Sequence, residues 1–170
     1  MWIALSVALT AFAIAGAISD AHSERIPNRL VLAGLGVALV LRAGWGLVPL
    51  AHGLAGGAIA LAIGIPFFAL RGMGGGDVKF LAACGVFVGL PLVGKAVLFS
   101  AIAGGILALL VIAKRGLPLV AALRTWNLAR AALTMGRTGE RMTLQDQGAI
   151  TAPYAIAIAA GVLIAWFGGA

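Results

Sequence analysis

The chain has 170 residues, of which 62% are hydrophobic and only 10% are charged, whereas a typical soluble domain carries about 25% charged residues. This composition excludes a water-soluble globular domain. The net charge of +7 does not indicate nucleic-acid binding, because the basic residues lie in gaps between apolar segments and form no stripe with aromatic partners. The single cysteine, Cys84, excludes an internal disulfide or a CxxC zinc site and is expected to be a packing residue.

Six apolar segments follow one another along the chain, at about 1–19, 30–48, 53–70, 78–90, 92–113 and 149–167. A helix needs about 20 apolar residues to cross a bilayer core of about 30 Å. The sequence therefore predicts an all-α, polytopic transmembrane bundle of about six spans, forming a single domain over residues 1–170. The first segment has no positively charged start, since the first basic residue is Arg25, so we expect an uncleaved helix rather than a signal peptide.

The basic residues predict the orientation, because cytoplasmic loops collect Lys and Arg. With an external N-terminus, Arg42 and Lys95 lie outside and the other basic residues lie in cytoplasmic gaps: Arg25, Arg29, Arg71, Lys79, Lys114, Arg115, Arg124, Arg130, Arg137 and Arg141. We therefore expect an external N-terminus, with Arg42 and Lys95 as anchors at the outer surface. The basic cytoplasmic segment at about 114–147 is expected to be an interfacial helix or a mobile loop.

Glycine is abundant, and small residues allow transmembrane helices to approach closely. The pairs Gly53 with Gly57 and Gly85 with Gly89 each have GxxxG spacing. We expect these pairs to lie at helix–helix contacts rather than in a substrate groove.

Two of the few acidic residues stand at membrane boundaries. The acids are Asp20, Glu24, Asp77, Glu140 and Asp146. Asp20 ends the first predicted span and Asp77 begins the fourth, so both are expected on the cytoplasmic side at similar depth. Two carboxyl groups held close together share one proton, and such a pair hydrolyses peptide bonds by activating a water molecule. The sequence therefore predicts a catalytic pair, Asp20 and Asp77.

The helix ends predict which carboxyl group is ionised. Asp77 is expected at a helix N-terminus, which favours a carboxylate, and Asp20 beyond a helix C-terminus, which disfavours one. We therefore expect Asp77 to be the ionised member. The alternatives are that Asp77 only caps its helix and that Asp20 only marks the end of a span.

Both aspartates lie beside residues that restrict or free the backbone. Gly72, Gly74, Gly75 and Gly76 precede Asp77; they permit positive φ and leave room for an extended peptide beside the carboxylate. After Asp20, the segment Ile26-Pro27-Asn28 is expected to form a turn, with Asn28 capping the second span. Lys79 is expected to reach the lipid headgroups or to tune Asp77.

Gly74-Gly75-Gly76-Asp77 fits the GxGD motif of the type IV prepilin peptidase family, and Asp20 followed by Ile26-Pro27-Asn28 fits its first-aspartate motif, in the same order. The chain resembles the short Tad/CpaA-type members that serve Flp pili, over nearly its whole length including Pro153-Tyr154. Presenilin-like proteases share GxGD but have a Tyr-Asp pair, whereas Ser19 precedes Asp20 here.

The resemblance implies an aspartic endopeptidase of the bacterial or archaeal cytoplasmic (inner) membrane. It implies that Asp20 and Asp77 cut the leader from a prepilin or pseudopilin at the cytoplasmic face, without a cofactor and with lipid and the pilin as partners. Larger relatives carry two CxxC pairs in an extra cytoplasmic domain and also methylate the new N-terminus. This chain lacks those cysteines, which argues against methyltransferase activity.

Three other interpretations of the acidic residues were weighed. Asp20, His22 and Glu24 are close in sequence, but they alternate around the chain and have no second cluster, so no metal site is expected. A small ion-coupled transporter requires acids near the middle of a span, and none is found there. A non-catalytic pilus-assembly scaffold predicts that replacement of either aspartate is tolerated.

Overall fold

The computed structural model describes residues 2–23, 25–70, 72–114 and 154–168. All regular structure in these ranges is helical, as the sequence predicted. The helices are α1 (Trp2–Ser23), α2 (Asn28–Ala43), α3 (Leu47–Ala69), α4 (Gly75–Val88), α5 (Leu90–Lys114) and α7 (Tyr154–Phe167). The basic segment predicted at about 114–147 falls almost wholly outside the described residues.

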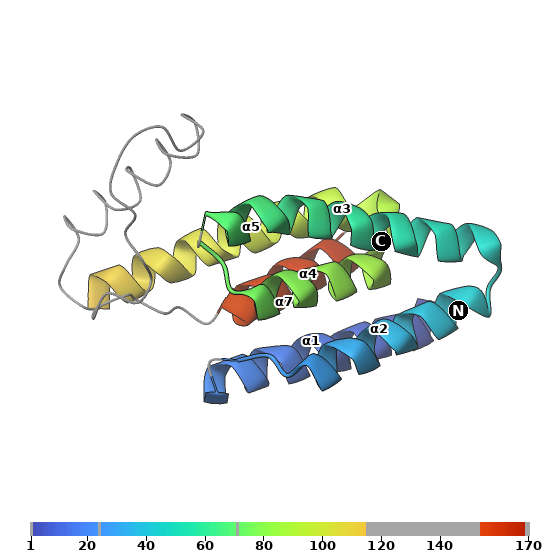
Figure 1. Ribbon diagram of the computed structural model, residues 1–170, viewed down its shortest axis with the longest axis horizontal. Coiled ribbons are helices and arrows are strands. Elements are labelled where there is room, and N and C mark those ends of the chain that lie inside the picture. The colour runs from blue at the N-terminus through green and yellow to red at the C-terminus, as the bar shows by residue number, and fades with distance from the viewer. Residues whose placement is uncertain (1, 24, 71, 115–153, 169–170) are drawn as a thin grey trace.

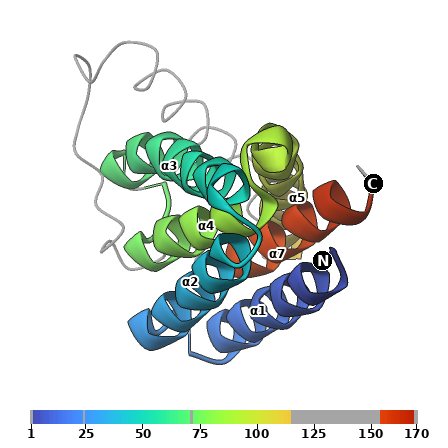
Figure 2. The same ribbon diagram turned by 90° about the vertical axis from the view of Figure 1, so that its right-hand side faces the viewer.

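The described helices lie nearly along one axis, so that the bundle has two ends (Figure 1). Viewed down this axis, α1 and α2 lie on one side, α3 and α5 on the other, and α4 and α7 between them (Figure 2). The C-terminal end of α1 and the N-terminal ends of α4 and α7 lie together at the left-hand end of Figure 1. We call this end the aspartate end, because Asp20 and Asp77 belong to it.

Among the described helices, α4 has the largest share of buried residues. Nine of its 14 residues are buried, and Phe80 and Phe87 are fully so. Its contact with α3 requires glycine on both sides: a Cβ on Gly56 would lie 2.5 Å from the carbonyl oxygen of Gly85, and one on Gly85 would lie 2.7 Å from that of Gly56. Backbones that approach this closely leave no space for a side chain.

The glycine pairs expected at helix contacts do lie there. A Cβ on Gly57 would clash with Val86, and one on Gly53 or Gly89 would clash with Arg42. Cys84 is fully buried within α4. The predictions for the glycine pairs and for Cys84 are therefore confirmed.

Helix α7 is held along its length by α1 and α5. The backbone of Ser100 in α5 packs directly against Gly161, and the Ser100 hydroxyl donates a hydrogen bond to the carbonyl of Ile158 (3.3 Å). Near the C-terminal end of α7, the indole Nε1 of Trp166 donates to the hydroxyl of Ser6 in α1 (2.8 Å). These contacts fix where the first turn of α7 lies relative to the end of α1.

Three described helices, α1, α3 and α5, are long and apolar enough to cross a membrane, and α7 is apolar but shorter. The count of six spans and the external N-terminus stay predictions. The second and third helices differ from the predicted boundaries. Helix α2 ends at Ala43 and α3 already begins at Leu47, because Gly46, at φ +115°, turns the chain between them.

Arg42 is not the surface anchor that was expected. It is only 7% exposed, and its guanidinium donates hydrogen bonds to the carbonyls of Phe87 in α4 (2.7 Å) and Pro49 in α3 (2.9 Å). The carbonyls at a helix C-terminus lack partners in the helix and favour a cation. Gly53 and Gly89 leave the space that the side chain occupies, so Arg42 fastens α2 and α3 to the end of α4.

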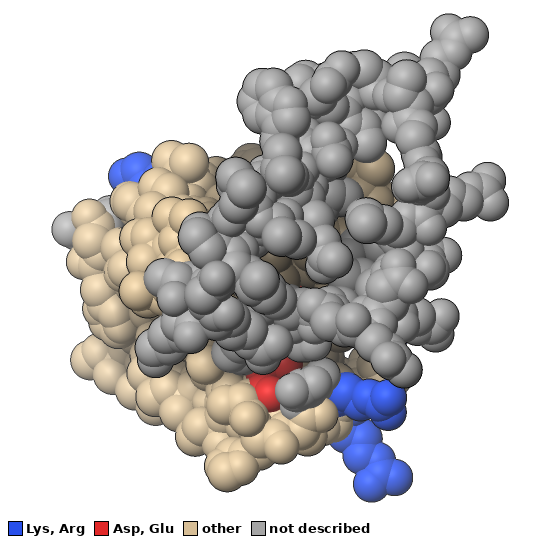
Figure 3. Space-filling view, turned by 90° about the vertical axis from the view of Figure 1, so that its left-hand side faces the viewer, with Lys and Arg blue, Asp and Glu red and all other residues tan. Residues whose placement is uncertain are grey.

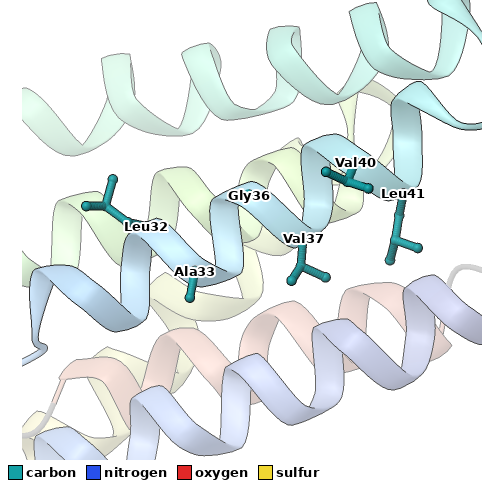
Figure 4. A pocket seen from close by; sticks show the side chains of 6 residues that line it. All are labelled: Leu32, Ala33, Gly36, Val37, Val40 and Leu41. Atoms are coloured by element: carbon teal, nitrogen blue, oxygen red, sulfur yellow. The ribbon is translucent and has the colours of Figure 1, made fainter.

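An apolar hollow follows the outward face of α2 (Figure 4). Its lining side chains are all apolar: Leu32, Ala33, Gly36, Val37, Val40 and Leu41. A hollow without polar groups carries no hydrolytic chemistry, and the aspartate end is therefore the place to look for a site.

Candidate active site

Asp20 lies within the last turn of α1, not beyond its end as the sequence predicted, because the helix continues to Ser23. The Ser19 hydroxyl donates to the carbonyl of Arg25 (3.2 Å), and the Ser23 hydroxyl donates to the carbonyl of Ser19 (2.6 Å), which ties the last turn of α1 to the residues that follow it. Asp20 itself is only 6% exposed. A carboxyl group so far removed from water requires hydrogen-bond donors from the protein.

One such donor comes from the other end of the chain. The backbone N–H of Ala155, the second residue of α7, donates to Oδ2 of Asp20 across 3.0 Å. N–H groups in the first turn of a helix have no acceptor within the helix, and the positive end of the helix dipole favours a negative charge. The contact therefore favours the ionised form of Asp20.

Asp77 lies in the first turn of α4, where it is half-buried. Its Oδ2 accepts a hydrogen bond from the backbone N–H of Gly74, which precedes the helix (3.3 Å). The side chain therefore does cap α4, as one alternative predicted, although from the third helical position. Capping leaves the carboxyl group half-buried at the aspartate end and does not exclude a second role.

The environment raises the pKa of Asp77 to about 6. Asp77 precedes the apolar segment that begins at Val78, so it lies outside the predicted span. Burial is the largest cause of the shift and the negative charge of Asp20 is the second, whereas the bond from Gly74 acts in the opposite direction. Repulsion by Asp20 means that the two carboxyl groups are close enough to influence each other.

These observations revise the expectation that Asp77 is the ionised member. That expectation considered only the helix end, whereas burial and the charge of Asp20 raise the pKa of Asp77 despite the hydrogen bond from Gly74. It also omitted α7, which provides Asp20 with a helix N-terminus of its own. Burial and the neighbouring Asp20 favour the protonated form of Asp77, and the Ala155 amide provides Asp20 with a hydrogen-bond donor.

The two sequence motifs meet at the aspartate end. A Cβ on Gly76 would lie 3.6 Å from the Cβ of Ile26, so the start of α4 packs directly on the turn between α1 and α2. Lys79 Nζ donates a hydrogen bond to Oδ1 of Asn28 (3.2 Å), which joins the same two segments. Residues about 50 positions apart in the chain thus form one small unit beside the two carboxyl groups.

The structure places two of the predicted site-shaping residues, Asn28 and Lys79. Asn28 is the first residue of α2 rather than its cap, which is Pro27, because proline already supplies the extended backbone that a cap position requires. Lys79 is exposed and donates a hydrogen bond to Asn28; its expected contact with lipid headgroups or influence on Asp77 stays a prediction.

The glycines before Asp77 do not use positive φ, contrary to expectation. Gly74 is at φ −70°, and within the described residues only Gly46 and Gly89 have positive values. Gly74 is needed for space instead, because a Cβ there would lie 3.0 Å from Oδ2 of Asp77. A Cβ on Gly75 would lie 3.3 Å from Cε2 of Phe68.

The surface of the aspartate end shows acidic atoms beside basic side chains (Figure 3). Of the five acids, Asp20 and Asp77 are the two that the structure describes. Within the described ranges, no three His, Cys, Asp or Glu side chains gather as a metal site. The arrangement is a pair of interacting carboxyl groups, one buried and one half-buried, at the edge of an apolar bundle.

A model of the type IV leader peptidase family matches residues 7–109. The chain belongs to the type IV leader peptidase family. The match includes both aspartates but is narrower than the resemblance over nearly the whole chain that was expected, since it ends within α5.

Searches for similar curated proteins and for similar solved structures gave no match. The family is one of peptidases that remove leaders, so the general activity of the chain is that of a leader peptidase in a protein with several apolar helices. Helix α7 lies outside the matched residues.

One contributor to the site was missed by sequence reasoning. The backbone N–H of Ala155 binds Asp20, but every residue except proline has such a group, so the identity of residue 155 carries no signal. The only pointer in the sequence was the neighbouring Pro153-Tyr154, noted through the family resemblance. Pro153 itself lies outside the described residues.

Proposed function

We propose that the protein is an aspartic endopeptidase, with Asp20 and Asp77 as its catalytic pair. The observation that carries the proposal is the electrostatic interaction of two carboxyl groups from sequence positions 57 residues apart, one of which has its pKa raised to about 6. Strongly perturbed pairs of this kind are typical of functional sites. A purely structural cap does not require a second carboxyl group nearby, which carries an energetic cost.

We propose that the substrate is a type IV prepilin or pseudopilin of the Flp type, cut between its short leader and its hydrophobic segment. The family match supports a leader as the substrate, and the position of the pair at the end of an apolar bundle supports a peptide bond at the membrane surface. The excess of Lys and Arg in the gaps at the same end supports the cytoplasmic face of the inner membrane.

The test is coexpression with a prepilin from the same genome, with processing followed as a shift of the precursor on a gel. We expect Asp20→Asn and Asp77→Asn each to reduce the cleavage rate by about 10²- to 10⁴-fold, the usual contribution of general acid–base catalysis. Membrane levels of both variants are expected to match the wild type. Normal cleavage by either variant would refute the pair.

A further inference from the structure

Helix α7 brings a backbone amide into the centre of the site. Ala155 is completely buried, Asp20 is 6% exposed, and the bond between them is 3.0 Å long. Away from water, a hydrogen bond to a charged acceptor is stronger than at a surface. Because α1 and α5 fix α7 along its length, the amide is positioned before any substrate arrives.

The two carboxyl groups are held unequally. Each lies at the N-terminal end of a helix, Asp20 at α7 and Asp77 at α4, but Asp20 also belongs to the last turn of α1, whose dipole opposes a negative charge. The Asp77 bond to Gly74 is longer, at 3.3 Å, and lies in an exposed part of the site. Both carboxyl groups bear a cost of burial, and the charge of Asp20 raises the pKa of Asp77 in addition.

We propose that the first turn of α7 is part of the catalytic centre, in which the Ala155 amide holds Asp20 as the carboxylate that activates water and so leaves Asp77 as the proton donor. This inference rests on the proposed peptidase function. Ala155 is a positioning residue, since it acts through Asp20 and does not touch the substrate.

The assignment gives a balanced reaction. Asp20 takes a proton from water while the water oxygen bonds to the carbonyl carbon of the scissile peptide, and Asp77 gives its proton to the carbonyl oxygen, forming a gem-diol. Asp20 then gives its proton to the amide nitrogen, the C–N bond breaks, and Asp77 takes a proton from one gem-diol hydroxyl. The products are an acid and an amine, and the pair returns to its starting state.

The pH profile follows from this assignment. Cleavage is lost at low pH when Asp20 is protonated, and at high pH when Asp77 loses its proton. The pKa of Asp77, about 6, places the alkaline limit at about pH 6 or above. The titratable and charged groups on the segments packed against Asp20 are Asp77 and Lys79 from α4, Tyr154 from α7, and Arg25 and Arg29 from the turn and start of α2. Because the two carboxyl groups interact, the limits belong to the pair.

The sharpest test removes only the N–H of residue 155. Incorporation of the α-hydroxy analogue of alanine replaces this amide by an ester without changing the side chain. The matched control is the same ester at Ala159, one turn further along α7, which removes a helical hydrogen bond away from Asp20. Ala155→Pro is a second variant, because proline lacks the N–H and is tolerated in a first helical turn.

We expect the ester at residue 155 to move the acid limb of the kcat/KM profile upward by about one pH unit, as loss of a charge-assisted hydrogen bond requires. The control ester is expected to leave both limbs in place. An equal loss of activity at every pH, the same for both esters, would mean that α7 is only structural and would overturn the inference.

A second measurement does not depend on cleavage. Carboxyl infrared difference spectra, assigned with Asp20→Asn and Asp77→Asn, report which group protonates first as the pH falls. We expect Asp77 to protonate before Asp20 in the wild type and this order to weaken in the ester at residue 155. Protonation of Asp20 first would overturn the inference even if prepilin is cleaved, whereas absence of cleavage with the expected order would refute the proposed function alone.

Discussion

An ionisable side chain lies at each end of helix α4, and the two ends hold these groups differently. At the C-terminal end, Arg42 is enclosed between Gly53 and Gly89 and bonded to two carbonyls. At the N-terminal end, Asp77 receives one longer hydrogen bond and stays half-buried. The Arg42 guanidinium complements the C-terminal end of the helix dipole, whereas the half-buried Asp77 carboxyl group stays accessible for chemistry. The C-terminal end of α4 at Arg42, which we call the sealed end, stabilises the fold. The N-terminal end at Asp77, which we call the open end, is available to a substrate.

The largest effect is expected at the sealed end. Arg42→Met leaves two carbonyls without their charged donor and should lower the free energy of unfolding by about 3 kcal/mol. Thermal unfolding in detergent measures this loss. Lysine cannot bridge both carbonyls as a planar guanidinium does, so the stability of Arg42→Lys should lie between those of the wild type and Arg42→Met. Activity per folded molecule should be unchanged. An unaltered stability would show that Arg42 does not fasten α4.

A second change tests the close contact of α3 with α4. Gly85→Ala places a Cβ 2.7 Å from the backbone oxygen of Gly56, and overpacking of this kind costs about 1–3 kcal/mol. Gly94→Ala is the matched control, because nothing lies within 4 Å of a Cβ there and alanine favours a helix over glycine. If both variants unfold alike, the close approach of the backbones has no energetic importance.

At the open end, a similar substitution should affect activity more than stability. Gly74→Ala places a Cβ 3.0 Å from Oδ2 of Asp77, which displaces the carboxyl group. If the displacement raises the activation free energy by about 1.4 kcal/mol, kcat falls about tenfold. Gly72→Ala, whose Cβ would have an ordinary contact at 3.6 Å, is the control. Equal rates for the two variants would contradict the proposed position of the Asp77 carboxyl group.

The smallest effect is expected for the hydrogen bond between Lys79 and Asn28. This pair is exposed, and exposed charged interactions contribute about 1 kcal/mol at most, so Lys79→Met should lower kcat/KM about fivefold or less. Lys95→Met, at an exposed lysine of α5 that was predicted on the outer side, provides the comparison. A loss beyond about a hundredfold would instead place Lys79 among the groups that touch the substrate.

Much of the fold was predictable, because apolar segments separated by polar turns specify helices without knowledge of their partners. The juxtaposition of Asp20 and Asp77 was also predictable, since both stand at span ends on the same predicted side. The burial of Arg42 was not, because a sequence does not reveal that Gly53 and Gly89 leave a channel for its side chain. The position of Arg42 near the end of a predicted span fits a surface anchor as well as a buried contact.

The state of the carboxyl groups depends on distances that the sequence does not contain. The argument from helix ends considered each aspartate with its own helix, and so Asp77 was expected to be ionised. The cost of burial at Asp77 and the approach of α7 to Asp20 arise only from tertiary packing. For the same reason, the sequence did not reveal which of the two expected roles the glycines near Asp77 serve: the structure shows a need for space at Gly74 and no positive φ there.

The bond between Ala155 and Asp20 has a consequence for biosynthesis. The two residues are 135 positions apart, so a nascent chain in which α1 to α5 have already inserted still lacks the amide that binds the Asp20 carboxylate. Proteolytic competence would therefore arise late, when α7 docks against its neighbours. Such an order of assembly would protect a membrane in which unfinished copies of the peptidase lie beside other translocating polypeptides.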